Sequence, residues 1–223
     1  MTVTMPKILP LENGDCLTRA EFEQRYEAMP HLKKAELIEG VVYMGSPVRV
    51  IHGRPHASIM TWLGTYWVAT PGVTLADNTT VRLDPDNEPQ PDALLRIEVG
   101  GQSTISEDGY VQGATEFIAE IAASSASYDL RDKLRVYRRN QVQEYLVWQV
   151  YDRKVDWFRF REGQYIALVA DETVIIRSEV FPGLGLSVPA LLAGNLAEVQ
   201  SALQIGLTTP EHQAFIEELK KRE

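Results

Sequence analysis

One apolar segment of this chain carries an acid in a position where acids are rare. Residues 116–122 read Glu-Phe-Ile-Ala-Glu-Ile-Ala, which predicts a β-strand. Because side chains alternate along a strand, Glu120 shares one face with Ile118 and Ala122. Burying a lone carboxylate in such a row is costly unless it is paired or binds a metal. The fold must therefore bring a partner to Glu120.

A second acid and a lysine are candidate partners for Glu120. Asp92 stands in a Pro-Asp pair at the start of an apolar run, which predicts a strand over 92–99. The polar, glycine-bearing stretch 100–113 predicts a long hairpin loop, so that Asp92 and Glu120 converge if the two strands pair. Carboxylate oxygens suit Mg²⁺ or Mn²⁺, with water and a substrate phosphate completing the shell. Lys133, on the helix expected next, would act as a point charge on that phosphate or orient the attacking water.

The remaining pattern predicts an α+β fold in a single domain over residues 1–223, with a core from about 18 to 192 and a C-terminal helical tail. We expect a strand buried on both faces over 142–151. Gly40 is expected to bend a strand, and Asn140 to end a helix in the left-handed conformation. The expected helices cover 17–29, 56–69, 127 or 129 to 139, a segment starting at Pro189, and 211–223 as a helix or frayed tail; the other expected strands cover 36–44, 73–76, 79–83, 155–161, 165–170 and 173–176.

The composition narrows the class of protein. With 44% hydrophobic and 24% charged residues, the chain has the balance of an ordinary globular protein. The net charge of -9 argues against a surface coated with basic residues for nucleic acid, although it allows a local basic face and suits a site that gathers divalent cations. The single cysteine, Cys16, excludes an internal disulfide framework and a cysteine-cluster metal site. Without a long apolar run or a secretory signal, we expect a cytoplasmic protein and no membrane partner.

Several short motifs, taken in chain order, resemble the PD-(D/E)XK nuclease superfamily. The resemblance is closer to one bacterial branch, the putative restriction endonuclease family formerly known as a domain of unknown function. It spans roughly Thr18 to Leu192, and the order and spacing of the motifs are more specific than any one of them. The motifs are Glu36-Leu37-Ile38-Glu39-Gly40, His56 with Ile59 and Leu63, Pro91-Asp92, Gly109 to Ala114, Glu120, Asp129 with Lys133 and Tyr137, and Glu144-Tyr145.

This resemblance implies a fold and a reaction. The fold would be a restriction-endonuclease-like mixed β-sheet flanked by helices, with the acids at one sheet edge. The reaction would be the divalent-metal-dependent hydrolysis of DNA phosphodiester bonds, which makes the protein an endodeoxyribonuclease. By the same resemblance, Asp92 and Glu120 would hold Mg²⁺ or Mn²⁺. Lys133 would stabilise charge or position water, and Glu36 would be an additional acid near the metal.

Two departures from the family pattern keep other functions open. The superfamily lysine usually stands two residues beyond the second acid, where this chain has Ala122, so Lys133 would be the substitute. The proline expected shortly after that acid is replaced by Ser124. The main alternative is therefore a catalytically inactive nuclease-fold protein that binds DNA or serves as a scaffold. A metal-independent hydrolase that uses Asp92 and Glu120 as acid and base ranks last, because nothing marks a sugar or acyl site.

Individual residues have simpler interpretations as well. Lys133 alone reads as a solvated helix residue or as the ion-pair partner of Asp129. Glu36 competes with Glu39, because strand alternation turns only one of them toward a site, and the family pattern favours Glu36. His56 reads as a helix-start or packing residue rather than a metal ligand.

The basic residues beside Lys133 are candidates for contact with DNA. Arg131, Arg135 and Arg138, together with Arg139, either solvate their helix or touch DNA phosphates. The aromatic residues from Trp148 to Phe160 are expected in the core or in a dimer interface. A homodimer is expected because cutting both strands of a duplex takes two sites.

Overall fold

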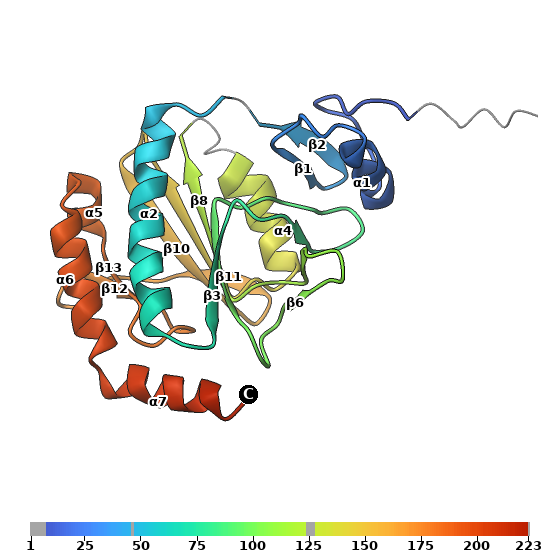
Figure 1. Cartoon of the computed structure of the whole chain (residues 1–223). Coiled ribbons are helices and arrows are strands. Elements are labelled where there is room, and N and C mark those ends of the chain that lie inside the picture. The colour runs from blue at the N-terminus through green and yellow to red at the C-terminus, as the bar shows by residue number, and fades with distance from the viewer. Residues whose placement is uncertain (1–7, 46, 124–127, 223) are drawn as a thin grey trace, which may run out of the picture.

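The structure is a computed structural model that describes residues 8–45, 47–123 and 128–222. Its framework is a six-stranded sheet in the order β11-β10-β9-β8-β5-β3 (Figure 1). The neighbours are antiparallel except β8 and β9, which run parallel. This mixed sheet with helices on both faces confirms the expected architecture. The strands are β3 (Val73–Asp77), β5 (Ala93–Ile97), β8 (Phe117–Ala122), β9 (Glu144–Gln149), β10 (Lys154–Arg161) and β11 (Gln164–Ala167).

Helix α2 (Val50–Ala69) covers one face of the sheet (Figure 1). Trp62 is fully buried there, with its ring edge-on to Phe117 and Trp157. The predicted start of this helix at His56 was wrong by six residues. Pro55 is a typical helix-start residue, but it lies in the second turn, so the pattern before it was missed.

The C-terminal helices α5 (Val188–Ala193), α6 (Leu196–Leu207) and α7 (Pro210–Lys220) continue the layer formed by α2. Their apolar residues join the same core cluster, which also contains Trp148 and Trp157. The helical segment expected to start at Pro189 is therefore divided into two helices, since Gly194 takes the left-handed conformation between α5 and α6. Small strands β12 (Ile175–Arg177) and β13 (Gly185–Ser187) pair with each other outside the main sheet.

The opposite face of the sheet is covered by helix α4 (Leu134–Arg139), which continues directly from a π-helical turn, η1 (Asp129–Lys133). Tyr137 of α4 packs edge-on to Tyr145 of β9 in a cluster with Ile118 and Ala122. This confirms the alternation predicted along 116–122. At the end of α4, Asn140 is not left-handed (φ −85°); the positive φ belongs to the next residue, Gln141 (63°).

The segment expected as one bent strand over 36–44 is a hairpin of β1 (Ala35–Ile38) and β2 (Val41–Met44). Glu39 and Gly40 form its turn with φ values of 54° and 74°, and positive φ at both positions is typical of a type I′ turn. Helix α1 (Arg19–Glu27), expected over 17–29, packs beside the hairpin, and Thr18 caps it by accepting from the Glu21 backbone amide.

The expected loop over 100–113 contains two short strands. The stretch 100–113 includes β6 (Thr104–Ile105) and β7 (Val111–Gln112), which form a three-stranded sheet with β4 (Val81–Arg82). In the part of the chain that the structure describes, no helix is long and apolar enough to cross a membrane.

Candidate active site

The register of β5 and β8 places the two candidate metal ligands opposite each other. Ala93 pairs with Ala119, and the strands are antiparallel. The residue before Ala93 (Asp92) therefore lies opposite the residue after Ala119 (Glu120), on the same face of the sheet. The Ile121 amide donates to Asp92 Oδ2 at 2.8 Å, which fixes the carboxylate against β8. Asp92 is 4% and Glu120 3% exposed. The resemblance implied acids at one sheet edge, but both strands are interior to the sheet: Asp92 directly precedes β5, and Glu120 lies within β8.

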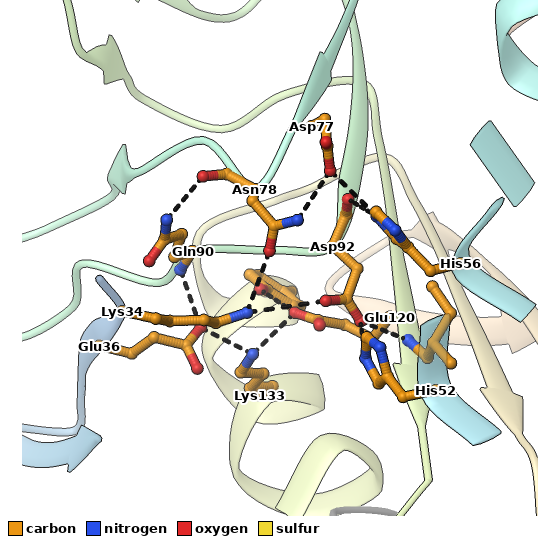
Figure 2. Close-up of polar contacts among 12 residues, drawn as sticks. Lys34, Glu36, His52, His56, Asp77, Asn78, Gln90, Asp92, Glu120 and Lys133 are labelled. Atoms are coloured by element: carbon orange, nitrogen blue, oxygen red, sulfur yellow. Dashed lines mark hydrogen bonds and ion pairs between the residues drawn. The ribbon is translucent and has the colours of Figure 1, made fainter. Parts of the chain in front are cut away.

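Lys133 brings Glu120 together with Glu36 of the hairpin. Its Nζ lies 2.8 Å from Glu120 Oε1 and 2.8 Å from Glu36 Oε1, as Figure 2 shows. The Tyr137 hydroxyl donates to Glu120 Oε1 at 2.9 Å, and the backbone amide of Gln90 donates to Glu36 Oε1 at 2.8 Å. Three separate elements, β1, β8 and the η1–α4 helix, therefore meet at one ammonium group.

Lys133 is 2% exposed, so its interpretation as a solvated helix residue was wrong. It ends the π-helical turn, and Tyr137 follows four residues later, one α-helical turn further on. The two side chains thus reach Glu120 from the same helix face. The alternative pairing of Lys133 with Asp129 involves a side chain outside the described part of the structure.

The Asp92 carboxylate is held by polar groups from two more elements. His52 Nε2 of α2 lies 3.3 Å from Asp92 Oδ2, and Lys34 Nζ lies 3.6 Å from Asp92 Oδ1. Burial opposes ionisation of this group, but the His52 hydrogen bond, the Lys34 charge and the Ile121 amide outweigh it. Together they hold the pKa of Asp92 well below its usual range. Asp92 is therefore a permanent anion at neutral pH.

His56 lies one helical turn after His52 and contacts the backbone of the site. Its Nε2 lies 3.0 Å from the Asp92 carbonyl oxygen and 3.0 Å from Asp77 Oδ1 (Figure 2). These contacts fix the start of β5 against α2, which agrees with the interpretation of His56 as a packing residue.

A divalent cation fits the donor chemistry of Asp92 and Glu120. Both present carboxylate oxygens, the ligands that Mg²⁺ and Mn²⁺ prefer. Three acids (Glu36, Asp92, Glu120) face two lysines (Lys34, Lys133), so the acids in this cluster outnumber the lysines by one. Among the described residues no group of three or more His, Cys, Asp or Glu is arranged to hold a metal. The remaining ligands would therefore be water and substrate, as is usual for Mg²⁺.

Glu39 and the arginines lie outside this cluster. Glu39 pairs with Arg139 at 2.8 Å, so of the two hairpin acids it is Glu36 that faces Lys133. Arg131 is exposed, Arg135 pairs with Asp132 at 2.7 Å, and Arg138 donates to Gln164 at 2.9 Å. Beyond the C-terminal half of α4 lies a hollow of about 460 Å³, lined among others by Arg135, Arg138, Arg139 and Phe160.

The sequence pattern did not predict three features of this site: Lys34, His52, and Tyr137 as the partner of Glu120. Lys34 stands two residues before Glu36, so strand alternation would have put both on one face. His52 stands four residues before His56, but the helix was expected to start too late to include it.

Comparisons with known proteins agree with this fold. The chain is similar to the crystal structure of a protein from Anabaena variabilis described as a putative nuclease belonging to DUF820, with a TM-score of 0.58 and 12% identity over 76% of this chain and 96% of that one. At this identity the likeness concerns the fold alone. The search among curated proteins found no match. A family model described as "Uma2: Putative restriction endonuclease" matches residues 19–189, which is most of the chain and nearly the range of the motifs. The chain therefore belongs to the Uma2 family of putative restriction endonucleases, a nuclease-type family.

Proposed function

We propose that this protein is a divalent-metal-dependent endonuclease that hydrolyses phosphodiester bonds in DNA. The observation that carries the proposal is the opposition of Asp92 and Glu120 on neighbouring strands, with the Lys133 ammonium 2.8 Å from Glu120. Membership of a family described as putative restriction endonucleases supports the same reaction and DNA as the substrate.

Asp92 and Glu120 would hold Mg²⁺ or Mn²⁺. When bound, such an ion lowers the pKa of a water ligand and neutralises charge on the scissile phosphate. The protein's own part is to keep both ligands ionised and fixed. For Asp92 this is done by Lys34, His52 and the Ile121 amide, which depress its pKa.

Lys133 would take the place of the lysine that is absent at Ala122. Its ammonium group is fixed between Glu120 and Glu36, so it orients both carboxylates and balances their charge. Glu36 would then be the additional acid of the site, close enough to Lys133 to accept a proton or to orient water.

The DNA would extend from this site over the exposed side of η1 and α4. Arg131, Arg135 and Arg138 are the proposed phosphate contacts, since Arg131 is exposed and Arg135 and Arg138 line the hollow beyond α4. A homodimer, in the cytoplasm with the DNA, belongs to the same proposal, because a double-strand cut takes two such sites. Light scattering on the purified protein would report the oligomeric state.

The experiment that tests the function offers the protein supercoiled plasmid, single-stranded DNA and branched DNA, with Mg²⁺, Mn²⁺ or EDTA. We expect cleavage of at least one substrate with metal and none with EDTA. The alternative is an inactive nuclease-fold protein, and the observation in its favour is the Lys34 ion pair on Asp92, which puts a lysine where a metal would bind. It predicts DNA binding without cleavage under every condition.

A further inference from the structure

Two lysines reach the site, and their surroundings differ. Lys133 is 2% exposed and lies 2.8 Å from each of two carboxylate oxygens. The Lys34 side chain is 30% exposed, and its Nζ makes two long contacts, 3.6 Å to Asp92 Oδ1 and 3.5 Å to Asn78 Oδ1. Figure 2 shows the two ammonium groups entering the site from different elements.

This difference matters for contact with a substrate. A phosphate arrives from solvent, so the cation that meets it has to be reachable from solvent. Lys133 would have to give up a short contact with a buried carboxylate, which is unfavourable because it leaves that charge uncompensated in a low-dielectric site. The Lys34 contacts are at or beyond the limit of a direct hydrogen bond, so its ammonium group can turn to a new acceptor at little cost.

The backbone around Lys34 holds this side chain at the site. The residue directly precedes β1, and its carbonyl accepts from the Gly45 amide at 3.0 Å. A Cβ on Gly45 would lie 3.1 Å from the Lys34 Cβ, so the absence of a side chain there allows the close approach. The hairpin thus holds the backbone and the Cβ of Lys34 close to Gly45, and the ammonium group at the end of the side chain makes only the two long contacts.

We propose that Lys34 is the lysine that contacts the scissile phosphate, whereas Lys133 is a positioning residue that holds Glu36 and Glu120. Lys34 would donate a hydrogen bond to a non-bridging phosphate oxygen and stabilise the charge that grows there during hydrolysis. The inference rests on the proposed function, since it names a contact with the same substrate in the same site.

Binding of a short DNA duplex measures this contact without any cleavage. Fluorescence anisotropy in Ca²⁺, over a series of KCl concentrations, gives the slope of log K against log salt. That slope is negative, and the loss of one phosphate contact reduces its magnitude by about 0.9. We expect this decrease for Lys34→Met. Lys220→Met on α7 is the matched control, because Lys220 is exposed and pairs with Glu217, and α7 lies at the opposite end of the molecule from the β1–β2 hairpin (Figure 1). The slope of this variant should equal that of the wild type.

Metal binding and cleavage separate a phosphate contact from a simple counterion of Asp92. Removing Lys34 removes a cation that competes for Asp92, so calorimetry should show Mn²⁺ binding to Lys34→Met as tight as to the wild type or tighter. Cleavage at saturating Mn²⁺ should nevertheless fall by roughly 100-fold in kcat. Lys34→Arg should recover part of it. If Lys34 were only a counterion of Asp92, Lys34→Met would have an unchanged kcat once Mn²⁺ is saturating.

The outcomes are distinguishable. A wild type that cleaves DNA, with an unchanged salt slope for Lys34→Met, overturns the role of Lys34 and leaves the proposed function standing. A wild type that binds DNA but never cleaves it overturns the proposed function, while the salt slope still decides whether Lys34 contacts a phosphate. A wild type that binds no DNA overturns both.

Discussion

The carboxylates of Glu36 and Glu120 share one buried ammonium group, and this arrangement sets the effect of changing any of the three. Lys133→Met would leave two buried acids without their common cation, and we expect a loss of about 3–5 kcal/mol in the free energy of unfolding. Adding Glu36→Gln should restore part of the loss, because one of the uncompensated charges disappears. Urea unfolding of Lys133→Met, Glu36→Gln and the double variant measures this coupling, and strictly additive effects would contradict the shared-ammonium arrangement.

Asp92 makes stability depend on pH in a defined direction. Its pKa is lowered in the folded protein, so the ionised group stabilises the fold above its unfolded pKa of about 3.9. That contribution is lost as the pH falls through the lower, folded value. Asp92→Asn should therefore be less stable than the wild type at pH 7, and the difference should shrink between about pH 5 and pH 2. A difference that stays constant over this range in urea titrations would rule out the lowered pKa.

At the scale of single residues, the sequence correctly predicted the side-chain positions that depend on local periodicity. The alternation along 116–122 placed Glu120 on the correct face, and the hairpin argument placed Asp92 opposite it. The contact of His52 was missed because it depends on a helix that continues across Pro55, which the period of the apolar residues does not set. Lys34 shares a strand face with Glu36, but its contact with Asp92 depends on how the hairpin packs beside β5, which alternation alone does not give.

Among the elements, the β1–β2 hairpin has the greatest effect on the site, because it carries both Lys34 and Glu36. Gly40 adopts a φ of 74° in its turn, and a Cβ there would lie 3.3 Å from the Leu17 carbonyl oxygen. We expect Gly40→Ala to lower the free energy of unfolding by about 1–2 kcal/mol. Gly53→Ala is the matched control: this glycine lies within α2 with nothing within 4 Å of its added Cβ, so the change should be neutral or stabilising. Equal losses in the two variants would show that the turn conformation is not responsible.

Strand β9 is joined to the segment after β12 through one buried side chain. Glu144 Oε1 accepts from the Glu179 and Val180 amides, and Oε2 accepts from Ser178 and Trp157. An amide cannot accept at both ends, so Glu144→Gln should cost about 1–3 kcal/mol for each donor pair left unsatisfied.

Thermal or urea unfolding would check the Glu144 change against Glu172→Gln, which alters an exposed turn residue. We expect near wild-type stability for the control. A Glu144→Gln variant as stable as that control would mean that these four contacts contribute little. In that case, the structural role of Glu144 would not explain why the family motif Glu144-Tyr145 contains an acid.

For the whole molecule, the order of the motifs along the chain predicted more than any of them alone. It led to the mixed sheet with helices on both faces, and the family match over residues 19–189 confirms the family. The small sheets and the long C-terminal helical layer were not predicted in detail. Their short strands carry few periodic residues, and their pairing depends on partners distant in sequence.

The rate of plasmid nicking tests the central claim most directly. At saturating Mn²⁺ we predict nicking by the wild type and by the control variant Asp171→Asn. Asp171 is an exposed residue whose carboxylate pairs with Arg177 at 2.7 Å. Asp92→Asn and Glu120→Gln should each be slower by roughly 100-fold or more, since each removes a proposed metal ligand. Wild-type rates in both variants, or equal nicking in EDTA, would contradict a metal-dependent site at Asp92 and Glu120.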